Sequence, residues 1–182
     1  IQKATDIGAL GIIVPMVDTA EKMENAVKFA HYPPLGRRSQ GGGQYGAIWG
    51  SDYRAAANDN IMIIAMIETE EGVAAADEIA SVDGVDGVFI ASSDLSSFSG
   101  YKQGDSQYEA LVTRIKSETE GAGKFVGGPS SWMTSREGYN FFQGPGTNSL
   151  IRMGVRVSLE ESDPCRFLPT GAAPVQGENP CP

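Results

Sequence analysis

The chain is poor in the residues on which several common kinds of active site depend. It has one histidine, His31, and two cysteines, Cys165 and Cys181, among 182 residues. A Ser-His-Asp triad or a Cys-His pair cannot be built from this inventory. The two cysteines match neither the spacing of a metal site nor a disulfide framework. Such cysteine usage is typical of a reduced protein, so we expect a cytoplasmic location.

Basic residues and long apolar runs are also scarce. The chain has 14 Lys and Arg against 23 Asp and Glu, which gives a net charge of −9. An acidic chain without a cluster of basic side chains is a poor nucleic-acid binder. No apolar run approaches the length of a membrane span, and no basic start leads into an apolar stretch. We therefore expect neither a nucleic acid nor a membrane as partner.

Short apolar runs alternate with helical patterns along most of the chain. With 41% hydrophobic residues, the composition suffices for one sizeable core. Strands are predicted over 11–17, 60–67, 86–91, 124–128 and 139–143, and helices over 19–30, 49–58, 70–81, 106–121, 131–137 and 147–159. Asp18 and Glu21 resemble a capping box at the start of the first of these helices. Residues 92–104, rich in Ser and Gly, are predicted to form a loop.

This alternation predicts an α/β fold with a parallel sheet. Five strand–helix units can be counted, whereas a complete eight-unit barrel takes about 250 residues. The first residue is Ile1 rather than Met, inside what reads as the end of a helix, so we expect a portion of a longer protein. Residues 1–162 are predicted to form one domain. Residues 163–182 lose all periodicity and are predicted to be a disordered tail.

Two acidic residues in the middle of the chain stand out. Glu68 directly follows the apolar run 61–67, and Asp94 closely follows the run 85–91. In a parallel barrel adjacent strands end at the same face, so two acids at strand ends converge there. Two carboxylates suit a hard divalent cation, which keeps water molecules that a substrate can replace. We therefore predict a metal-dependent enzyme with Glu68 and Asp94 as metal ligands.

Several motifs, in order along residues 1–160, resemble the HpcH/HpaI aldolase family of the phosphoenolpyruvate/pyruvate-binding barrels. The matching pieces are Gly-Ile-Ile-Val-Pro-Met-Val at 11–17, Tyr-Pro-Pro-Leu-Gly-Arg-Arg at 32–38, Ala-Asn-Asp-Asn at 57–60, Ile-Glu-Thr at 67–69, Gly-Val-Asp-Gly-Val-Phe-Ile at 84–90 and Ser-Asp-Leu-Ser at 93–96. The run Phe-Phe-Gln-Gly-Pro at 141–145 is more similar to fungal members, macrophomate synthase among them, than to bacterial aldolases.

The resemblance implies a (β/α)8 TIM barrel of which this chain supplies about strands four to eight, so the barrel is incomplete. Family members are commonly hexamers, and they cleave or form a carbon–carbon bond next to a pyruvate unit with Mg²⁺, Mn²⁺ or Co²⁺. The resemblance assigns the metal to Glu68 and Asp94. It assigns the substrate carboxylate to backbone N–H groups of Ser93 and Asp94, and donors at a helix N-terminus suit an anion.

The resemblance also places part of the machinery outside this chain. The general-base histidine, its aspartate partner and the substrate-binding arginine belong to the family's first strands, which have no counterpart here. We therefore expect this chain alone to be inactive. His31 lies in a different loop and is predicted to be structural. Arg37 and Arg38 are predicted to anchor a loop or to carry solvated charge.

Two departures from the family pattern fall close to the predicted site. Met66 stands where the family has a glutamine that contacts the substrate, and a thioether cannot donate that hydrogen bond. Ala91 and Ser92 stand where the family has Gly-Pro, so the shape of the following loop can differ. These positions leave the choice of substrate open.

The sequence therefore leaves three functions open. The first is a metal-dependent carbon–carbon lyase, an aldolase that cleaves a 2-oxo acid into pyruvate and an aldehyde. The second resembles macrophomate synthase, in which oxaloacetate is decarboxylated and the enolate adds to another acceptor. The third is a non-catalytic remnant that binds only metal or partner subunits. An open sheet with exposed edges and apolar faces would make such a piece insoluble unless association covers it.

Overall fold

The computed structural model describes residues 1–41 and 44–160, which divide into two units. The first unit comprises residues 1–143 and contains the whole sheet. The second begins at Gly144, and its described part holds one helix, α9 (Thr147–Glu160). The predicted tail, residues 163–182, lies outside the described residues. None of the helices in the described ranges combines the length and hydropathy that crossing a membrane requires.

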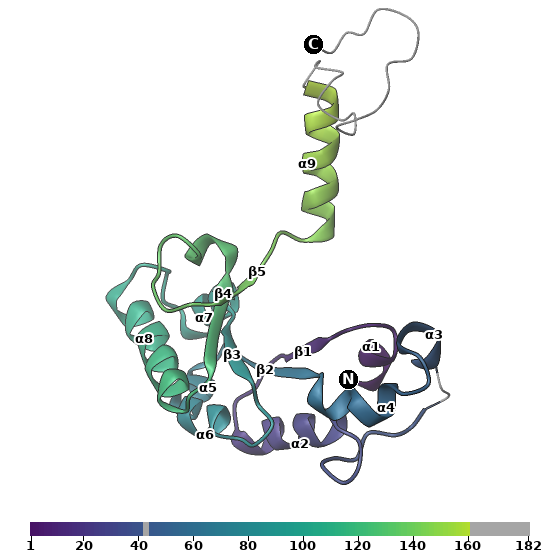
Figure 1. The fold of residues 1–182 in the computed structure, drawn as a ribbon. Coiled ribbons are helices and arrows are strands. Elements are labelled where there is room, and N and C mark those ends of the chain that lie inside the picture. Colours follow the sequence, from purple (N-terminus) through teal and green to yellow (C-terminus); the bar gives the residue numbers. More distant parts are fainter. Residues whose placement is uncertain (42–43, 161–182) are drawn as a thin grey trace, which may run out of the picture. The chain divides into compact units, whose positions relative to one another are not determined.

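The first unit is built on five parallel strands that lie side by side in chain order (Figure 1). They are β1 (Gly11–Val14), β2 (Met62–Ile67), β3 (Gly87–Ile90), β4 (Phe125–Pro129) and β5 (Phe141–Gln143). Each strand pairs in parallel with its neighbour along the chain, and helical segments connect most of them. The sheet curls into part of a barrel, which confirms the predicted fold class of an incomplete (β/α) barrel.

The helices of this unit lie on the outer side of the curved sheet or beyond the ends of its strands (Figure 1). Their bounds are α1 (Gln2–Asp6), α2 (Ala20–Ala30), α3 (Gly46–Trp49), α4 (Tyr53–Ala56), α5 (Glu70–Ala74), α6 (Ala76–Ala80), α7 (Ser92–Ser99) and α8 (Ser106–Gly121), with 3-10 turns at Ala57–Asp59 and Ser130–Trp132. Helix α6 packs against both α2 and α8 on this outer side (Figure 1).

Alternation along the strands separates an outer core from an inner one. In β2, Ile63 and Ile67 belong to the large core under the helices, whereas Ile64 and Met66 belong to a smaller cluster on the inner face. Successive side chains of a strand point to opposite faces, so both faces of this sheet are apolar. Such strands are typical of a barrel, in which the outer face packs on helices and the inner face on other strands.

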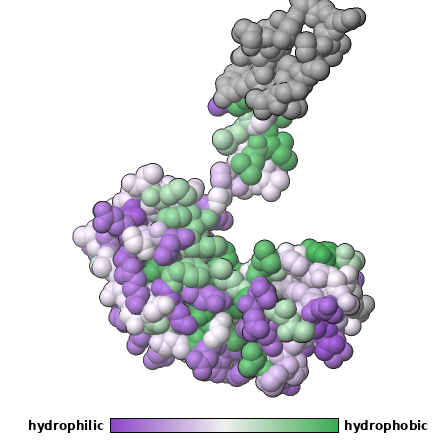
Figure 2. Space-filling model, in the orientation of Figure 1, coloured by the Kyte–Doolittle hydropathy of each residue, from purple (hydrophilic) through white to green (hydrophobic). Residues whose placement is uncertain are grey.

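The inner face stays partly open in the described residues. Its hollow holds a pocket of about 310 Å³ lined by Leu10, Gly11, Ile13, Met62, Ile64 and Phe141. Figure 2 shows hydrophobic surface gathered in the hollow of this first unit. The side chain at Met62 remains 40% exposed. The unburied apolar face that five strands were predicted to leave is therefore present.

One predicted loop is wrong, because residues 92–99 form helix α7. Leu95 is completely buried and anchors this segment in the core. The hydroxyl of Ser99 donates to the Leu95 carbonyl at 2.6 Å, and that of Ser96 donates to the Tyr101 carbonyl at 2.6 Å. The serines therefore bond to nearby backbone without breaking the helix, and packing outweighs their low helix propensity.

Two further local predictions are corrected. Thr19, not Asp18, caps α2, because its hydroxyl accepts the N–H of Lys22 at 3.3 Å. The capping-box prediction for Asp18 is therefore wrong, and its carboxylate makes other contacts described below. The helix predicted over 131–137 is only a 3-10 turn, Ser130–Trp132, followed by further turns. There the buried Trp132 packs on Tyr139 with ring centroids 5.2 Å apart, which keeps the segment short and compact.

Candidate metal and carboxylate site

The predicted acids lie at the carboxyl ends of two adjacent strands. Ile67 of β2 pairs with Ile90 of β3, and the N–H of Ala91 continues the ladder by donating to the Ile67 carbonyl at 3.2 Å. Glu68 follows Ile67 directly, so strand alternation turns its side chain to the same inner face as Met66. Glu68 and the start of α7 therefore follow the ends of two neighbouring strands.

Glu68 is buried, with only 5% of its surface exposed. Its Oε1 accepts the backbone N–H of Met16 at 2.6 Å. Met16 lies just beyond β1, so the end of a third strand contributes to the same edge. A carboxylate has about four lone-pair positions, and one N–H bond leaves Oε2 free to bind another group.

Asp94 and Ser93 lie in the first turn of α7 and are exposed. The first bond of this helix is donated by Leu95 to the Ala91 carbonyl at 2.8 Å, so the amides of Ser93 and Asp94 have no intrahelical acceptor. No described residue donates a hydrogen bond to the Asp94 carboxylate. This turn therefore offers both unused backbone donors and a free carboxylate.

A buried tyrosine fixes the position of this turn. Tyr108 of α8 is fully buried, and its hydroxyl donates to the Ser92 carbonyl at 3.1 Å. Burial raises the pKa of Tyr108 to about 12, so the hydroxyl keeps its proton and remains a donor. Tyr108 thus joins α8 to the first residue of α7.

The donor set fits a divalent cation that keeps most of its water. Across residues 1–41 and 44–160, no group of three or more His, Cys, Asp or Glu side chains lies close enough to hold a metal ion. A closed structural zinc site is therefore not formed by these residues. Mg²⁺ commonly uses only one or two protein carboxylates beside substrate and water, so a pair of acids is enough for such an ion.

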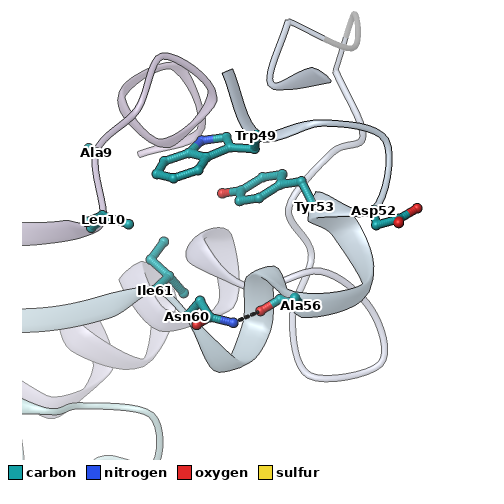
Figure 3. Close-up of a pocket in the computed structure, with 8 residues that line it drawn as sticks. All are labelled: Ala9, Leu10, Trp49, Asp52, Tyr53, Ala56, Asn60 and Ile61. Atoms are coloured by element: carbon teal, nitrogen blue, oxygen red, sulfur yellow. Dashed lines mark hydrogen bonds between the residues drawn. The ribbon is translucent and has the colours of Figure 1, made fainter. Parts of the chain in front are cut away.

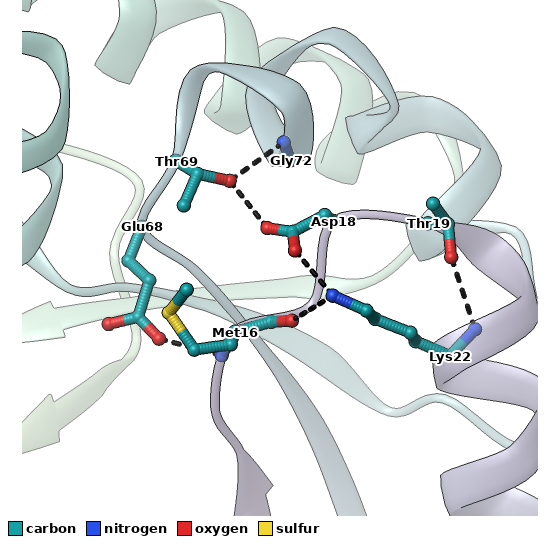
Figure 4. Close-up of polar contacts among 7 residues, drawn as sticks. All are labelled: Met16, Asp18, Thr19, Lys22, Glu68, Thr69 and Gly72. Carbon is teal, nitrogen blue, oxygen red and sulfur yellow. Dashed lines mark hydrogen bonds and ion pairs between the residues drawn. The ribbon is translucent and has the colours of Figure 1, made fainter.

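A network of polar contacts surrounds Glu68 on the side of β1 and α2 (Figure 4). Thr69, the N-cap of α5, accepts the N–H of Gly72 at 3.1 Å and donates to Asp18 Oδ1 at 2.5 Å. Lys22 Nζ donates to Asp18 Oδ2 at 2.5 Å and to the Met16 carbonyl at 3.2 Å. The hydrogen bond from Lys22, followed by that from Thr69, lowers the pKa of Asp18 below its usual value, so this carboxylate is ionised at neutral pH.

The remaining candidates lie at the opposite, amino-terminal edge of the strands. His31 is the C-cap residue of α2, is 7% exposed, and its Nδ1 lies 2.9 Å from the Val27 carbonyl. Arg38 is buried, and its Nη2 donates to Asp6 Oδ1 at 2.6 Å, whereas Arg37 is exposed. The predictions of a structural histidine and a loop-anchoring arginine agree with these contacts.

A pocket of about 360 Å³ opens at this same edge (Figure 3). Its lining includes Leu10 just before β1 and Ile61 just before β2. Trp49 and Tyr53 stack beside it with ring centroids 5.6 Å apart, and the indole N–H donates to the Thr5 carbonyl at 3.1 Å. This pocket is far along the strands from Glu68, since it lies before their first residues and Glu68 lies after their last.

The contacts of Asp18, Lys22, Thr69 and Tyr108 were not found from the sequence. Asp18 and Lys22 are four positions apart, which is the spacing of a helical ion pair, so that contact carried a local signal. The bond between Asp18 and Thr69 spans 51 positions, and that between Tyr108 and Ser92 spans 16. Such contacts leave no periodic pattern in a single sequence.

Known proteins are similar to this chain in both sequence and fold. The family described as HpcH/HpaI aldolase/citrate lyase matches residues 1–128. A hydroxypyruvate/pyruvate aldolase of Rhizorhabdus wittichii is 39% identical over 131 residues, covering 70% of this chain and 52% of that protein. The chain thus spans about half the length of the curated relatives it matches.

Two solved structures illustrate the likeness in fold. An HpcH/HpaI aldolase/citrate lyase family protein from Burkholderia cenocepacia is 26% identical with a TM-score of 0.74, covering 87% of this chain and 67% of that one. Macrophomate synthase is 23% identical with a TM-score of 0.70, covering 86% and 60%, and at this identity the likeness concerns the fold alone. With a family match over residues 1–128 and this barrel geometry, the chain belongs to the HpcH/HpaI aldolase/citrate lyase family.

Proposed function

We propose that the protein is a divalent-metal-dependent carbon–carbon lyase that acts on a 2-oxo acid containing a pyruvate unit. The observation that supports the proposal is that the buried Glu68 follows the end of β2 and the first turn of α7 follows the end of the neighbouring strand β3. Family membership and the printed activity of the Rhizorhabdus relative, a hydroxypyruvate/pyruvate aldolase, support the same reaction class.

Each residue of the edge has a distinct task in this proposal. Glu68 and Asp94 would hold Mg²⁺, or Mn²⁺ or Co²⁺ in its place, through their carboxylates. When bound, the ion supplies Lewis-acid stabilisation of the negative charge that develops on the pyruvate unit. The amides of Ser93 and Asp94 bind the substrate carboxylate, because donors at a helix N-terminus favour an anion.

The proton-transfer groups are not found among the described residues of this edge. The histidine of the chain, His31, lies at the other end of the strands and bonds to its own helix. A general base and an arginine supplied by further barrel strands therefore remain part of the proposal, as do a cytoplasmic location and a homohexameric full-length protein. Light scattering on the full-length protein tests the hexamer.

Metal binding can be tested on the chain itself. We expect Mn²⁺ binding, followed by electron paramagnetic resonance, to weaken by more than about 100-fold in Glu68→Gln and Asp94→Asn, since outer-shell partners alone cost about 10- to 100-fold. Asp77→Asn and Glu78→Gln on α6 are matched controls, because both acids are exposed and stand away from the strand edge. Equal Mn²⁺ affinity in all four variants would refute the metal site.

The reaction class needs a second experiment on the protein at its full natural length. Exchange of the pyruvate methyl protons with deuterium oxide reports proton removal next to the carbonyl, and NMR follows it directly. We expect exchange that depends on Mg²⁺ and is lost in Asp94→Asn. Metal binding without exchange would leave the non-catalytic alternative, and rapid oxaloacetate decarboxylation without aldehyde condensation would favour the second enzyme.

A further inference from the structure

The Glu68 carboxylate is held from outside its own strand. Met16 donates its N–H to Glu68 Oε1 at 2.6 Å, and the hydroxyl of Thr69, the residue after Glu68, donates a hydrogen bond to Asp18 Oδ1 at 2.5 Å. These two bonds bridge 52 and 51 positions of the sequence. The loop after β1 therefore bonds both to the Glu68 side chain and to the residue that follows it (Figure 4).

Lys22 connects these two hydrogen bonds into one network. Its ammonium donates to the carbonyl of Met16 at 3.2 Å and to Asp18 Oδ2 at 2.5 Å. One side chain of α2 thus fixes both the residue whose amide holds Glu68 and the carboxylate that holds Thr69. The Lys22 side chain is itself 54% exposed, so its charge takes part in the network without being buried.

The backbone conformation at Met16 and the close packing at Gly72 accompany these contacts. Met16 has φ 54°, the one positive φ of a non-glycine residue among the described residues. Such a conformation is uncommon for a residue with a side chain and persists where surrounding contacts fix it. A Cβ at Gly72 would lie 2.8 Å from the Val17 carbonyl oxygen and 3.3 Å from Thr69 Oγ1, so the two loops are packed closely.

We propose that Asp18, Lys22 and Thr69, together called the Asp18 clamp, are positioning residues for the metal ion of the proposed function. The clamp holds the Met16 amide against Oε1 of Glu68, which would leave Oε2 available to the cation. Outer contacts of this kind orient the ligands of a metal and set its affinity. The inference rests on the proposed function, because it gives the clamp a role only if Glu68 binds the ion.

The first test compares two lysines of the same helix. Lys22→Met removes the clamp ammonium, whereas Lys28→Met removes the partner of Glu24, an exposed pair with the same spacing and an N–O distance of 3.4 Å. We expect Lys22→Met to weaken Mn²⁺ binding by about 10-fold and Lys28→Met to leave it unchanged. Equal Mn²⁺ affinity in the two variants overturns the proposal.

The second test compares two threonines that cap helices. Thr69→Val and Thr19→Val each lose one N-cap hydrogen bond, but only Thr69 also bonds to Asp18. Both variants should lower the melting temperature of the metal-free chain, and only Thr69→Val should weaken Mn²⁺ binding. Thr69→Ser keeps the hydroxyl and should restore the affinity. A Thr69→Val variant that melts lower yet binds Mn²⁺ normally assigns Thr69 a merely structural role.

A third readout needs no metal. The amide proton resonance of Met16 in the metal-free chain reports its bond to Glu68, so Lys22→Met should shift this resonance and Lys28→Met should not.

The Mn²⁺ measurements distinguish failure of the clamp from failure of the proposed function. If Glu68→Gln abolishes Mn²⁺ binding and the clamp variants leave that binding unchanged, the clamp fails and the metal site stands. If Glu68→Gln leaves Mn²⁺ binding intact, the proposed function fails, whatever the resonance of Met16 does.

Discussion

The two ends of the parallel sheet use their charged residues in opposite ways. At the amino-terminal edge, the Arg38 side chain is fully buried, pairs with Asp6 and lies 4.5 Å from the centre of the Tyr32 ring. At the carboxyl-terminal edge, Glu68 is buried with one oxygen free, and Asp94 is exposed in a helical first turn. The charges of the first set are paired with each other inside the protein, whereas the second set retains capacity for a ligand.

This difference shows how charges that stabilise the fold can be distinguished from charges that are available to bind a ligand. Burial alone does not separate them, because Arg38 and Glu68 are 3% and 5% exposed. Their partners do separate them, because Arg38 pairs with the opposite charge of Asp6, whereas Glu68 accepts a single backbone N–H. Removing a partner should therefore cost stability at the first edge and ligand affinity at the second.

The largest effect is expected at the amino-terminal edge. Arg38→Met leaves Asp6, which is 4% exposed, without its opposite charge, and breaking such a buried pair costs about 3–5 kcal/mol. Urea unfolding should show this loss, while Mn²⁺ affinity should stay unchanged. Arg37→Met is the matched control, because that side chain is exposed. If the two variants are equally stable, the comparison between the edges fails.

Gly72→Ala is expected to have an intermediate effect on both the stability of the chain and its affinity for Mn²⁺. The added methyl group would meet the Val17 carbonyl oxygen at 2.8 Å, so the β1–α2 loop has to move. Overpacking of this kind costs about 1–3 kcal/mol, and the displaced loop should also weaken Mn²⁺ binding. Gly121→Ala in α8 meets no atom within 4 Å and should stabilise the chain slightly. A Gly72→Ala variant with normal affinity would contradict the coupling between the loop and Glu68.

A smaller effect is expected from Tyr108→Phe. It removes the bond to the Ser92 carbonyl and should cost about 1 kcal/mol at neutral pH. Because burial raises the folded pKa of Tyr108 from 10.0 to about 12, the stabilisation by the neutral hydroxyl is present below pH 10 and is lost as the pH rises toward 12. Wild type and variant should therefore approach one another in urea unfolding across that window. A constant difference would argue against a buried hydroxyl.

The smallest effect is expected from Asp18→Asn. The hydrogen bond from Lys22 lowers the folded pKa below the usual value of 3.8, so the ionised carboxylate stabilises the chain above that pH and ceases to do so as the pH falls below it. A partly exposed pair contributes less than about 1 kcal/mol, and urea unfolding at pH 7 and pH 3 measures it. Glu24→Gln, from the exposed pair with Lys28, is the control.

The sequence predicted the sheet better than the site. All five strands lie within or close to the predicted ranges, because apolar runs of this length are strong local signals. Helix α7 was missed because its serines favour turns, and only the burial of Leu95 in the folded chain reveals why it is helical. The placement of Glu68 at a strand end was predicted, since it follows directly from the strand.

The contacts that hold Glu68 could not be predicted in the same way. Asp18 was assigned to the wrong task because capping depends on one backbone position, and Thr19 occupies it. Met16, whose amide bonds to Glu68, has a positive φ, which is uncommon for a residue such as methionine. Joint binding of a cation by Glu68 and Asp94 is still a prediction.

The alternation in β2 has a consequence for protein engineering. Met62, Ile64, Met66 and Glu68 form one column of side chains on the inner face, separate from the outer core of Ile63, Ala65 and Ile67. A change at position 66 therefore alters the polarity next to Glu68 while leaving the helix-facing packing untouched. This column is a natural target for a small mutant library that seeks altered selectivity without loss of foldability.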